Sequence, residues 1–359
     1  MPVCRSFLQA GICFDLKRET MYTDNKSLSF EKILMAPRGG MNMYDITVIG
    51  AAIVDVLAAP VSPEIFESNS QPAEQIRLSF GGDALNEAVV LSRMGKHVQL
   101  IGKTGDDDAG RRVLDYMKEN HLSADSMRIE PGLPTGINIV LIDAAGERHF
   151  LTNPQGSLRK LTYEDIIPYL DDAAGIVSFA SMFVSPLLTI EAMERLFREI
   201  KKRNRILLCD LTGAKNGETL QDISCLLPYI AIIVPNESEI ALLTGERDSS
   251  VNARLLLDAG VKTAVIKCGG DGCIVADRDG LTRIPAVPGI HAVDSTGAGD
   301  TFAAGFLTGL SEGWPVRDCA RLACAAASCA IETVGAADGI RSREQVTERY
   351  RLLSRFERI

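Results

Sequence analysis

One segment of the chain combines the residue types needed to bind an anion and to remove a proton. Residues 294–306 read Asp-Ser-Thr-Gly-Ala-Gly-Asp-Thr-Phe-Ala-Ala-Gly-Phe, with Gly297 and Gly299 placed before Asp300. Glycines let a ligand approach the main chain, and a helix beginning there would direct free N–H groups at phosphate. Asp300 would repel that phosphate, so its expected role is to take a proton from an attacking hydroxyl. An ordinary glycine-rich turn with an acid at a helix start accounts for the same pattern.

The composition excludes several classes of function. The 359 residues are 46% hydrophobic and 24% charged, which is enough for one large domain or two smaller ones. The net charge of −9 argues against a nucleic-acid-binding surface, and no apolar stretch approaches the length of a membrane span. The nine cysteines include no Cys-x-x-Cys pair and there are four histidines, so no zinc site is expected. Buried free thiols in a reducing cytosol, and hence a cytoplasmic location, are the favoured interpretation.

The chain divides into an atypical start and one regular domain. Residues 1–43 show weak periodicity, so we expect a disordered extension or a gene start placed too early. From 44 to 342, short apolar runs alternate with helical patterns, which predicts a parallel sheet covered on both faces. Residues 343–359 are expected to form a C-terminal helix of the same domain. Segments at about 73–81 and 134–153 read as antiparallel strands and a hairpin, forming either a β lid or a plain sheet-edge extension.

Several glycine- or acid-bearing loops are expected to meet at one rim of the sheet, because ligands of an open α/β sheet bind beyond the carboxyl ends of its strands. These loops carry Asp55, residues 81–83, Asn236, residues 269–272 and residues 294–300. Two common nucleotide motifs are excluded. The run Gly102-Lys103-Thr104 lacks the first glycine of a P-loop, since position 97 is His97. Phe302 stands where a dinucleotide fingerprint needs its third glycine.

Five segments, in order along the chain, resemble motifs of the ribokinase-like (PfkB) carbohydrate kinases. Residues 81–88 with Gly95 resemble the first signature of that family, and residues 294–300 resemble the second. Between them lie counterparts of the family's glycine-rich segment, Asn-x-x-Glu motif and nucleotide-side strand–turn, at residues 101–110, 234–239 and 266–272. The resemblance implies an ATP-dependent kinase with a ribokinase-like three-layer α/β sandwich, a mostly parallel central sheet and a small β lid.

The resemblance also implies a role for each matching residue. Asp300 resembles the catalytic base, and the amides of Gly297, Ala298 and Gly299 resemble an anion hole for the transferred phosphoryl group. The residues that would bind the sugar are Asp55, Gly81, Gly82 and Asn86. Those on the ATP side would be Asn236, Lys267, Gly269, Gly272 and Cys324. Simpler roles stay open: a strand-end carboxylate for Asp55, a charged strand edge for Lys267, and plain packing for Cys324.

Two cation sites and the partners follow from the same resemblance. Glu239, with Asn236, would order Mg²⁺ and its waters near the phosphates, unless it belongs to a solvated helix face. Asp294 and Thr296 would form a K⁺ site of the kind that part of the family has. The expected partners are a small sugar or sugar-like molecule and, through the β lid, a second copy of the chain, with neither nucleic acid nor membrane.

The identity of the acceptor stays open. After Cys209 the chain reads Asp-Leu-Thr-Gly-Ala-Lys, without the Asn and Arg that many sugar kinases of the family have there. This departure argues against a phosphorylated or carboxylated sugar. The expected reaction moves the γ-phosphoryl group of ATP to a primary alcohol of a sugar or sugar-like substrate. The alternatives are a nucleoside kinase of the same family and a catalytically silent sugar-binding regulator.

Overall fold

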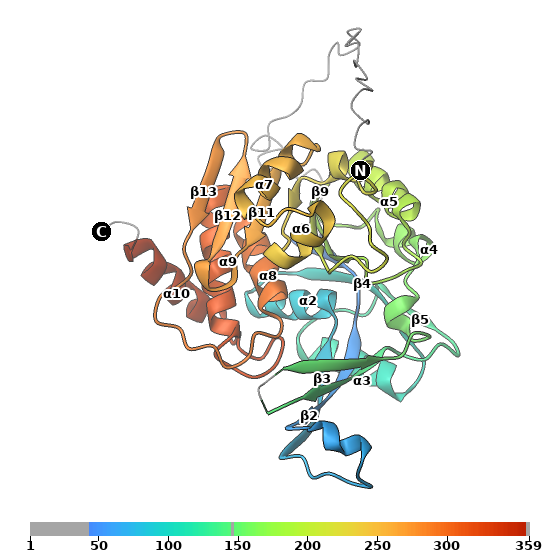
Figure 1. The fold of residues 1–359 in the computed structure, drawn as a ribbon. Helices are drawn as coiled ribbons and strands as arrows, with labels where there is room; N and C mark the ends of the chain where they lie inside the picture. Colours follow the sequence, from blue (N-terminus) through green and yellow to red (C-terminus); the bar gives the residue numbers. More distant parts are fainter. Residues whose placement is uncertain (1–42, 145–146, 357–359) are drawn as a thin grey trace, which may run out of the picture. The chain divides into compact units, whose positions relative to one another are not determined.

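The computed structural model describes residues 43–144 and 147–356. Its centre is a nine-stranded sheet in the order β13-β12-β11-β10-β9-β8-β1-β4-β5 (Figure 1). In this order, each strand from β11 through β10, β9, β8, β1 and β4 to β5 is parallel to its neighbour. Strands β12 and β13 are antiparallel and are added at one edge. Their bounds are β1 Ile46–Ile49, β4 Val98–Gly105, β5 Met127–Glu130, β8 Ile176–Met182, β9 Ile206–Leu211, β10 Ile232–Ile233, β11 Thr263–Lys267, β12 Cys273–Asp277 and β13 Gly280–Ile284.

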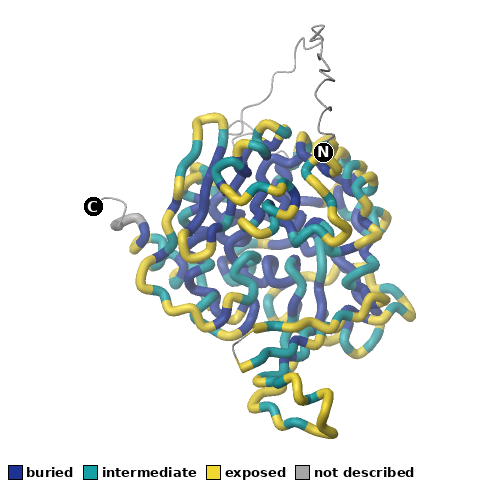
Figure 2. The backbone as a smooth tube through the Cα atoms, viewed as in Figure 1, coloured by how far each residue is buried: buried dark blue, intermediate teal, exposed yellow. Residues whose placement is uncertain are grey.

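Helices cover both faces of this sheet, which is why its strands are short apolar runs that are buried on both sides (Figure 2). Helices α4, α5, α6 and α7 share one apolar core with the sheet, while α2, α8 and α9 pack together on the other face. The predicted three-layer α/β arrangement with a mostly parallel central sheet is confirmed. The helix bounds are α2 Asp83–Arg93, α3 Asp108–Glu119, α4 Tyr163–Ile166, α5 Ile190–Lys202, α6 Glu237–Thr244, α7 Ser249–Asp258, α8 Ala298–Ser311, α9 Val316–Ala330 and α10 Arg343–Phe356.

A second sheet of four strands, which we call the lid sheet, has the order β3-β2-β6-β7. Strands β3 (Gln75–Gly81), β6 (Ile137–Ile142) and β7 (Arg148–Thr152) lie within the segments from which we expect a lid. Strand β2 (Ile53–Ala59) is not predicted from the sequence. It follows β1 after three residues, so the two strands read as one apolar run, and it carries Asp55 into the lid sheet.

The lid sheet carries a polar row on one face and an apolar row on the other, since successive side chains of a strand point to opposite faces. One row across all four strands is polar: Ser79, Asp55, Asn138 and Thr152. The next row, on the opposite face, is apolar: Leu78, Val56, Ile139 and Leu151. Leu78 is 54% exposed and Leu151 is 56% exposed, so this apolar row lies largely open to solvent.

Residues 1–42, where we expect the N-terminal extension, lie outside the described residues, as do residues 357–359 of the expected C-terminal helix. The division at residues 43 and 343 stays a prediction. The seven cysteines of the described part are free, and all except Cys225 are buried. Within the described ranges, no helix combines the length and the apolar character needed to span a membrane.

Candidate active site

The segment 294–300 forms a tight turn that leads into helix α8. Gly297 caps the helix with a φ of +67°, a left-handed conformation that favours glycine. A Cβ atom at this position would lie only 2.0 Å from the carbonyl oxygen of Ala336. Both the backbone conformation and the available space therefore require glycine at position 297.

Helix α8 begins with amide groups that have no backbone partner. Within the described part of the chain, the N–H groups of Gly299 and Asp300 donate to no backbone oxygen. The N–H of Ala298 faces the carbonyl oxygen of Ser295 at 3.3 Å, a long hydrogen bond. The positive end of the helix dipole and at least two N–H groups are thus available to an anion.

Asp300 lies in the first turn of α8 and lines a cleft of about 1040 Å³. Its Oδ2 accepts a hydrogen bond of 2.8 Å from Nδ2 of Asn86, which is on helix α2. Burial and the carboxylates of Asp83 and Asp210 raise the pKa of Asp300 well above its usual range. A carboxylate whose pKa is raised binds a proton more strongly, so this environment suits a general base.

The residues predicted to bind ATP and magnesium line the same cleft as Asp300. They are Asn236, Glu239, Lys267, Gly269, Gly272 and Cys324. Gly269 belongs to a short 3-10 turn, Gly269–Asp271, that joins β11 to β12 at the carboxyl end of β11. An apolar part of the lining, which includes Val287, Ile290 and Ile331, offers a surface for a ring. The volume and the mixed lining are those of a site for a nucleotide-sized ligand.

Lys267 is not a solvated strand edge, because it forms a buried ion pair. Its Nζ lies 2.8 and 2.6 Å from the two carboxylate oxygens of Asp210, and its side chain is 13% exposed. Burial raises the pKa of Asp210 to about 7. Although burial opposes it, the charges of Asp210 and Glu239 raise the pKa of Lys267. A Cβ atom on Gly299 would lie 3.4 Å from Nζ of Lys267, so the ammonium group is beside the first turn of α8.

Asn236 and Glu239 form a reciprocal capping box at the start of α6. The Glu239 N–H donates to Oδ1 of Asn236 at 2.8 Å, and the Asn236 N–H donates to Oε2 of Glu239 at 2.7 Å. Within the described residues, Oε1 of Glu239 accepts no hydrogen bond, so this oxygen remains available in the cleft. No group of three or more His, Cys, Asp or Glu side chains in the described ranges is arranged to hold a metal.

Asp55, predicted to bind the sugar, lies in the polar row of the lid sheet, between Ser79 and Asn138. Its Oδ1 accepts a hydrogen bond of 3.1 Å from Nδ2 of Asn138, and burial raises its pKa to about 6. A Cβ atom on Gly81 would lie 2.1 Å from Oδ2 of Asp55, so the carboxylate fits only against glycine. The Oδ1 of Asn138 is buried without a partner within the described chain. A buried acceptor without a partner beside a carboxylate suits a ligand that donates hydroxyl groups.

The residues predicted to bind the sugar are connected to the cleft through helix α2. Gly82 caps this helix, and Asn86, one turn further on, donates to Asp300. Asp55, Gly81, Gly82 and Asn86 themselves are not part of the cleft lining. Three further residues at the cleft were assigned no role from the sequence: Asp83, Ser181 and Asp210. Asp83 belongs to the first signature and Asp210 lies near the carboxyl end of β9, and these are the signals that could have identified these two residues.

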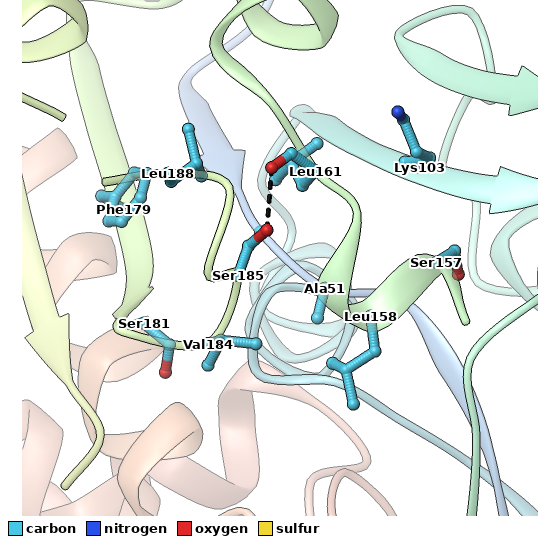
Figure 3. Close-up of a pocket in the computed structure, with 11 residues that line it drawn as sticks. Ala51, Lys103, Ser157, Leu158, Leu161, Phe179, Ser181, Val184, Ser185 and Leu188 are labelled. Carbon is cyan, nitrogen blue, oxygen red and sulfur yellow. Dashed lines mark hydrogen bonds between the residues drawn. The ribbon is translucent and has the colours of Figure 1, made fainter. Parts of the chain in front are cut away.

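A smaller cavity of about 20 Å³ adjoins the site and includes Ser181 in its lining (Figure 3). Its other lining residues are mostly apolar, and the Oγ of Ser185 donates to the carbonyl oxygen of Leu161 at 2.8 Å. This volume holds about one water molecule and is too small for a sugar. Lys103, also in this lining, pairs with Asp165 at 2.6 Å and has a structural role.

Comparisons with known proteins identify the fold first and then the family. The chain resembles the ribokinase of Arabidopsis thaliana complexed with ribose and ATP, with a TM-score of 0.73, 24% identity and coverage of 86% of this chain and 98% of that one. It also resembles a nucleoside kinase of Burkholderia thailandensis in complex with inosine, with a TM-score of 0.69, 20% identity and coverage of 85% and 95%. The fold is therefore ribokinase-like, as predicted.

The sequence comparison gives the family. A family model, the pfkB family carbohydrate kinase, matches residues 43–343, so the chain belongs to the PfkB family of carbohydrate kinases. A 5-dehydro-2-deoxygluconokinase of Clostridium perfringens is 27% identical over 319 residues, which is 85% of this chain and 92% of that protein. The family resemblance inferred from residues 81–88 and 294–300 is confirmed.

Proposed function

We propose that this protein transfers the γ-phosphoryl group of ATP to a primary hydroxyl of a sugar or sugar-like acceptor, with Asp300 as the general base. The observation that carries the proposal is the first turn of α8. This turn presents a carboxylate of raised pKa and the unpaired N–H groups of Gly299 and Asp300 to one cleft. A base and an anion site within one helical turn are what in-line phosphoryl transfer to an alcohol requires.

The transfer step follows from these groups. The acceptor hydroxyl donates a hydrogen bond to Asp300, and its proton passes to the carboxylate as the new oxygen–phosphorus bond forms. The bond between the γ-phosphorus and the bridging oxygen breaks, and ADP leaves with that electron pair. Negative charge on the phosphoryl oxygens is stabilised by the amides of the α8 turn and by Lys267 beside them. The lid sheet would exclude water, which otherwise competes as acceptor.

The donor set near Glu239 fits a magnesium ion that keeps most of its water. Glu239 has one oxygen outside its capping box, and a single carboxylate with water and substrate phosphates is a usual environment for Mg²⁺. When bound, the ion would neutralise charge on the phosphates. Asn236 would position Glu239 through the capping box, and the apolar wall near Cys324 would contact the base of ATP.

The direct test is a screen of the purified protein with ATP and Mg²⁺ against pentoses, hexoses, other polyols and nucleosides. Release of ADP is measured, and the phosphorylated product is identified by mass spectrometry. Turnover with a sugar supports the proposal, and turnover with nucleosides alone makes the protein a nucleoside kinase. Binding of a sugar in calorimetry without ADP release would make it a silent sugar-binding regulator and overturn the proposal.

Acceptor binding should depend on pH through Asp55. Its pKa of about 6 lies above the usual value, so the carboxylate that accepts hydroxyl hydrogen bonds is present above pH 6 and is lost below it. We expect the KM for the acceptor to rise as pH falls below 6, by up to about tenfold per pH unit, with the KM for ATP much less affected. Asp55→Asn should raise the acceptor KM at every pH and remove this dependence. An unchanged pH profile in Asp55→Asn would contradict the assigned role.

We further propose that the apolar face of the lid sheet binds a second copy of the chain, as we expect from the sequence. Five apolar side chains on this face are between 38% and 72% exposed: Ile76, Leu78, Ile137, Ile139 and Leu151. Single exposed apolar residues are common, but a contiguous face of this kind marks an interface.

We also propose a cytoplasmic location, since the described cysteines are free thiols.

The dimer proposal predicts that a charge in the centre of the apolar face separates the copies. Ile139→Lys should convert a dimer into a monomer in sedimentation equilibrium, because an ammonium group would be buried without a partner. Leu242→Lys is the matched control, since Leu242 is an exposed apolar residue of α6, 62% exposed and outside the lid sheet. A wild-type protein that stays monomeric as its concentration is raised would refute the proposal.

A further inference from the structure

Asp294, at the start of the segment that leads into α8, has both carboxylate oxygens occupied by donors. Oδ1 accepts hydrogen bonds from the Thr296 N–H at 2.9 Å and from the Thr296 hydroxyl at 2.7 Å. Oδ2 accepts a hydrogen bond of 2.9 Å from the N–H of Gly335. The guanidinium of Arg148 forms an ion pair with Oδ1, and the Asp294 side chain is only 5% exposed.

The hydrogen bonds and the ion pair of Asp294 do not fit the K⁺ site that we expect at Asp294 and Thr296. The Thr296 hydroxyl uses its proton toward Asp294, and the charge of the carboxylate is balanced by Arg148 rather than by a bound ion. Although burial opposes it, hydrogen bonds from Thr296 and Gly335 and the charge of Arg148 hold the pKa of Asp294 below its usual value. The carboxylate is therefore ionised and fully paired within the protein itself.

Arg148 comes from a distant part of the fold. It is the first residue of β7 in the lid sheet and pairs with Ile142 of β6. Because side chains alternate between the two faces along a strand, Arg148 lies on the same face of β7 as Phe150 and Thr152. This is the face of the lid sheet that carries Asp55. One ion pair thus connects the acceptor-side sheet to the segment that ends at Gly297 and Asp300.

We propose that Arg148 is a positioning residue that supplies from the lid sheet the positive charge at Asp294, so that the α8 turn is ordered without a monovalent cation. The proposal rests on the proposed function, because it assigns Arg148 to the geometry of that phosphoryl-transfer site. Docking of the lid sheet brings the guanidinium to Asp294, and the segment 294–300 then holds its N–H groups and Asp300 in place. The wild-type protein accordingly needs no potassium.

The simplest competing explanation is an ion pair of structural value only. Many exposed ion pairs contribute little to stability, but this one joins a side chain that is 20% exposed to a carboxylate that is 5% exposed. A structural pair would change the unfolding temperature when broken, without making the reaction sensitive to a particular cation. The response to cations is therefore the measurement that separates the two roles.

The test compares wild type, Arg148→Ala and Arg148→Lys in potassium chloride and in choline chloride of equal ionic strength. We expect equal wild-type rates in the two salts. For Arg148→Ala we expect a kcat that is about 10- to 100-fold lower in choline and partly restored by potassium or guanidinium ions, as for a displaced active-site segment. Arg148→Lys should retain most of the rate. Arg198→Ala, which breaks an exposed ion pair within α5, is the matched control.

A second measurement does not depend on turnover. Potassium should raise the unfolding temperature of Arg148→Ala relative to choline, and should leave wild type and Arg148→Lys unchanged. Potassium activation of the wild type, or an Arg148→Ala variant with normal kcat and no response to potassium, would overturn the proposal. Failure of every acceptor in the screen would refute the proposed function, while the unfolding measurement would still report on the ion pair.

Discussion

Asp300→Asn will lower kcat by about 10²- to 10⁴-fold, because the amide cannot take the proton of the acceptor hydroxyl. The fold should persist, since Asn86 can still hydrogen-bond the new side chain at this position. The replacement also removes a negative charge from a site where Asp83 and Asp210 raise the pKa of Asp300. We therefore expect a free energy of unfolding equal to or above that of the wild type, a case in which an active site is maintained at a cost in stability.

Steady-state rates with the best acceptor, ATP binding by calorimetry and thermal unfolding together measure this effect. Asp115→Asn is the matched control, because Asp115 is an exposed aspartate on α3 outside the cleft. The control should match the wild type in all three measurements. An Asp300→Asn variant with unchanged turnover would remove Asp300 from the mechanism and leave the anion site without its base.

Lys267→Met should have the largest effect on stability. The substitution leaves the carboxylate of Asp210, whose side chain is 6% exposed, without its partner, and breaking such a buried pair costs about 3–5 kcal/mol. The pKa of Asp210, already about 7, should rise further without the ammonium group. A carboxyl group whose pKa is raised in the folded state destabilises the fold increasingly as pH rises toward that pKa. The stability deficit relative to the wild type should therefore grow as pH rises above about 7, where Asp210 of the wild type is ionised. Urea unfolding across this pH range measures it.

The double variant Asp210→Asn/Lys267→Met separates the two roles of Lys267 that the sequence leaves open. It removes both charges, so most of the lost stability should return, since no buried charge is left unpaired. Its kcat should stay low, because the ammonium group beside Gly299 is absent when charge develops on the phosphoryl group. A double variant with wild-type kcat would show that Lys267 only stabilises the strand end.

The parts of this molecule that could be predicted from the sequence are those determined by patterns of neighbouring residues. Alternating apolar runs and helical patterns predict the parallel sheet, since both periodicities are local. The glycines before Asp300 predict a helix N-terminus at an anion site for the same reason, and the structure has α8 begin at Ala298. The Asn236 and Glu239 spacing is also local, although its direct structural result is a capping box.

The remainder depends on contacts between distant residues. Strand β2 continues an apolar run begun by β1, so nothing in the sequence marks the point where the chain leaves one sheet for the other. The pair of Lys267 with Asp210 spans 57 positions, and that of Arg148 with Asp294 spans 146. Pairs of this kind are set by which strands and loops are neighbours in space, and a single sequence does not contain that information.

The lid sheet builds two unlike surfaces from the same four strands, with Asp55 on one and Leu78 on the other. Acceptor binding on one surface and self-association on the other cannot be independent if both favour the same arrangement of strands. By thermodynamic reciprocity, an acceptor that tightens self-association by some factor is itself bound more tightly by that factor in the associated form. One dissociation constant would then describe this protein only at the enzyme concentration where it was measured, and dilute assays would report the weaker value.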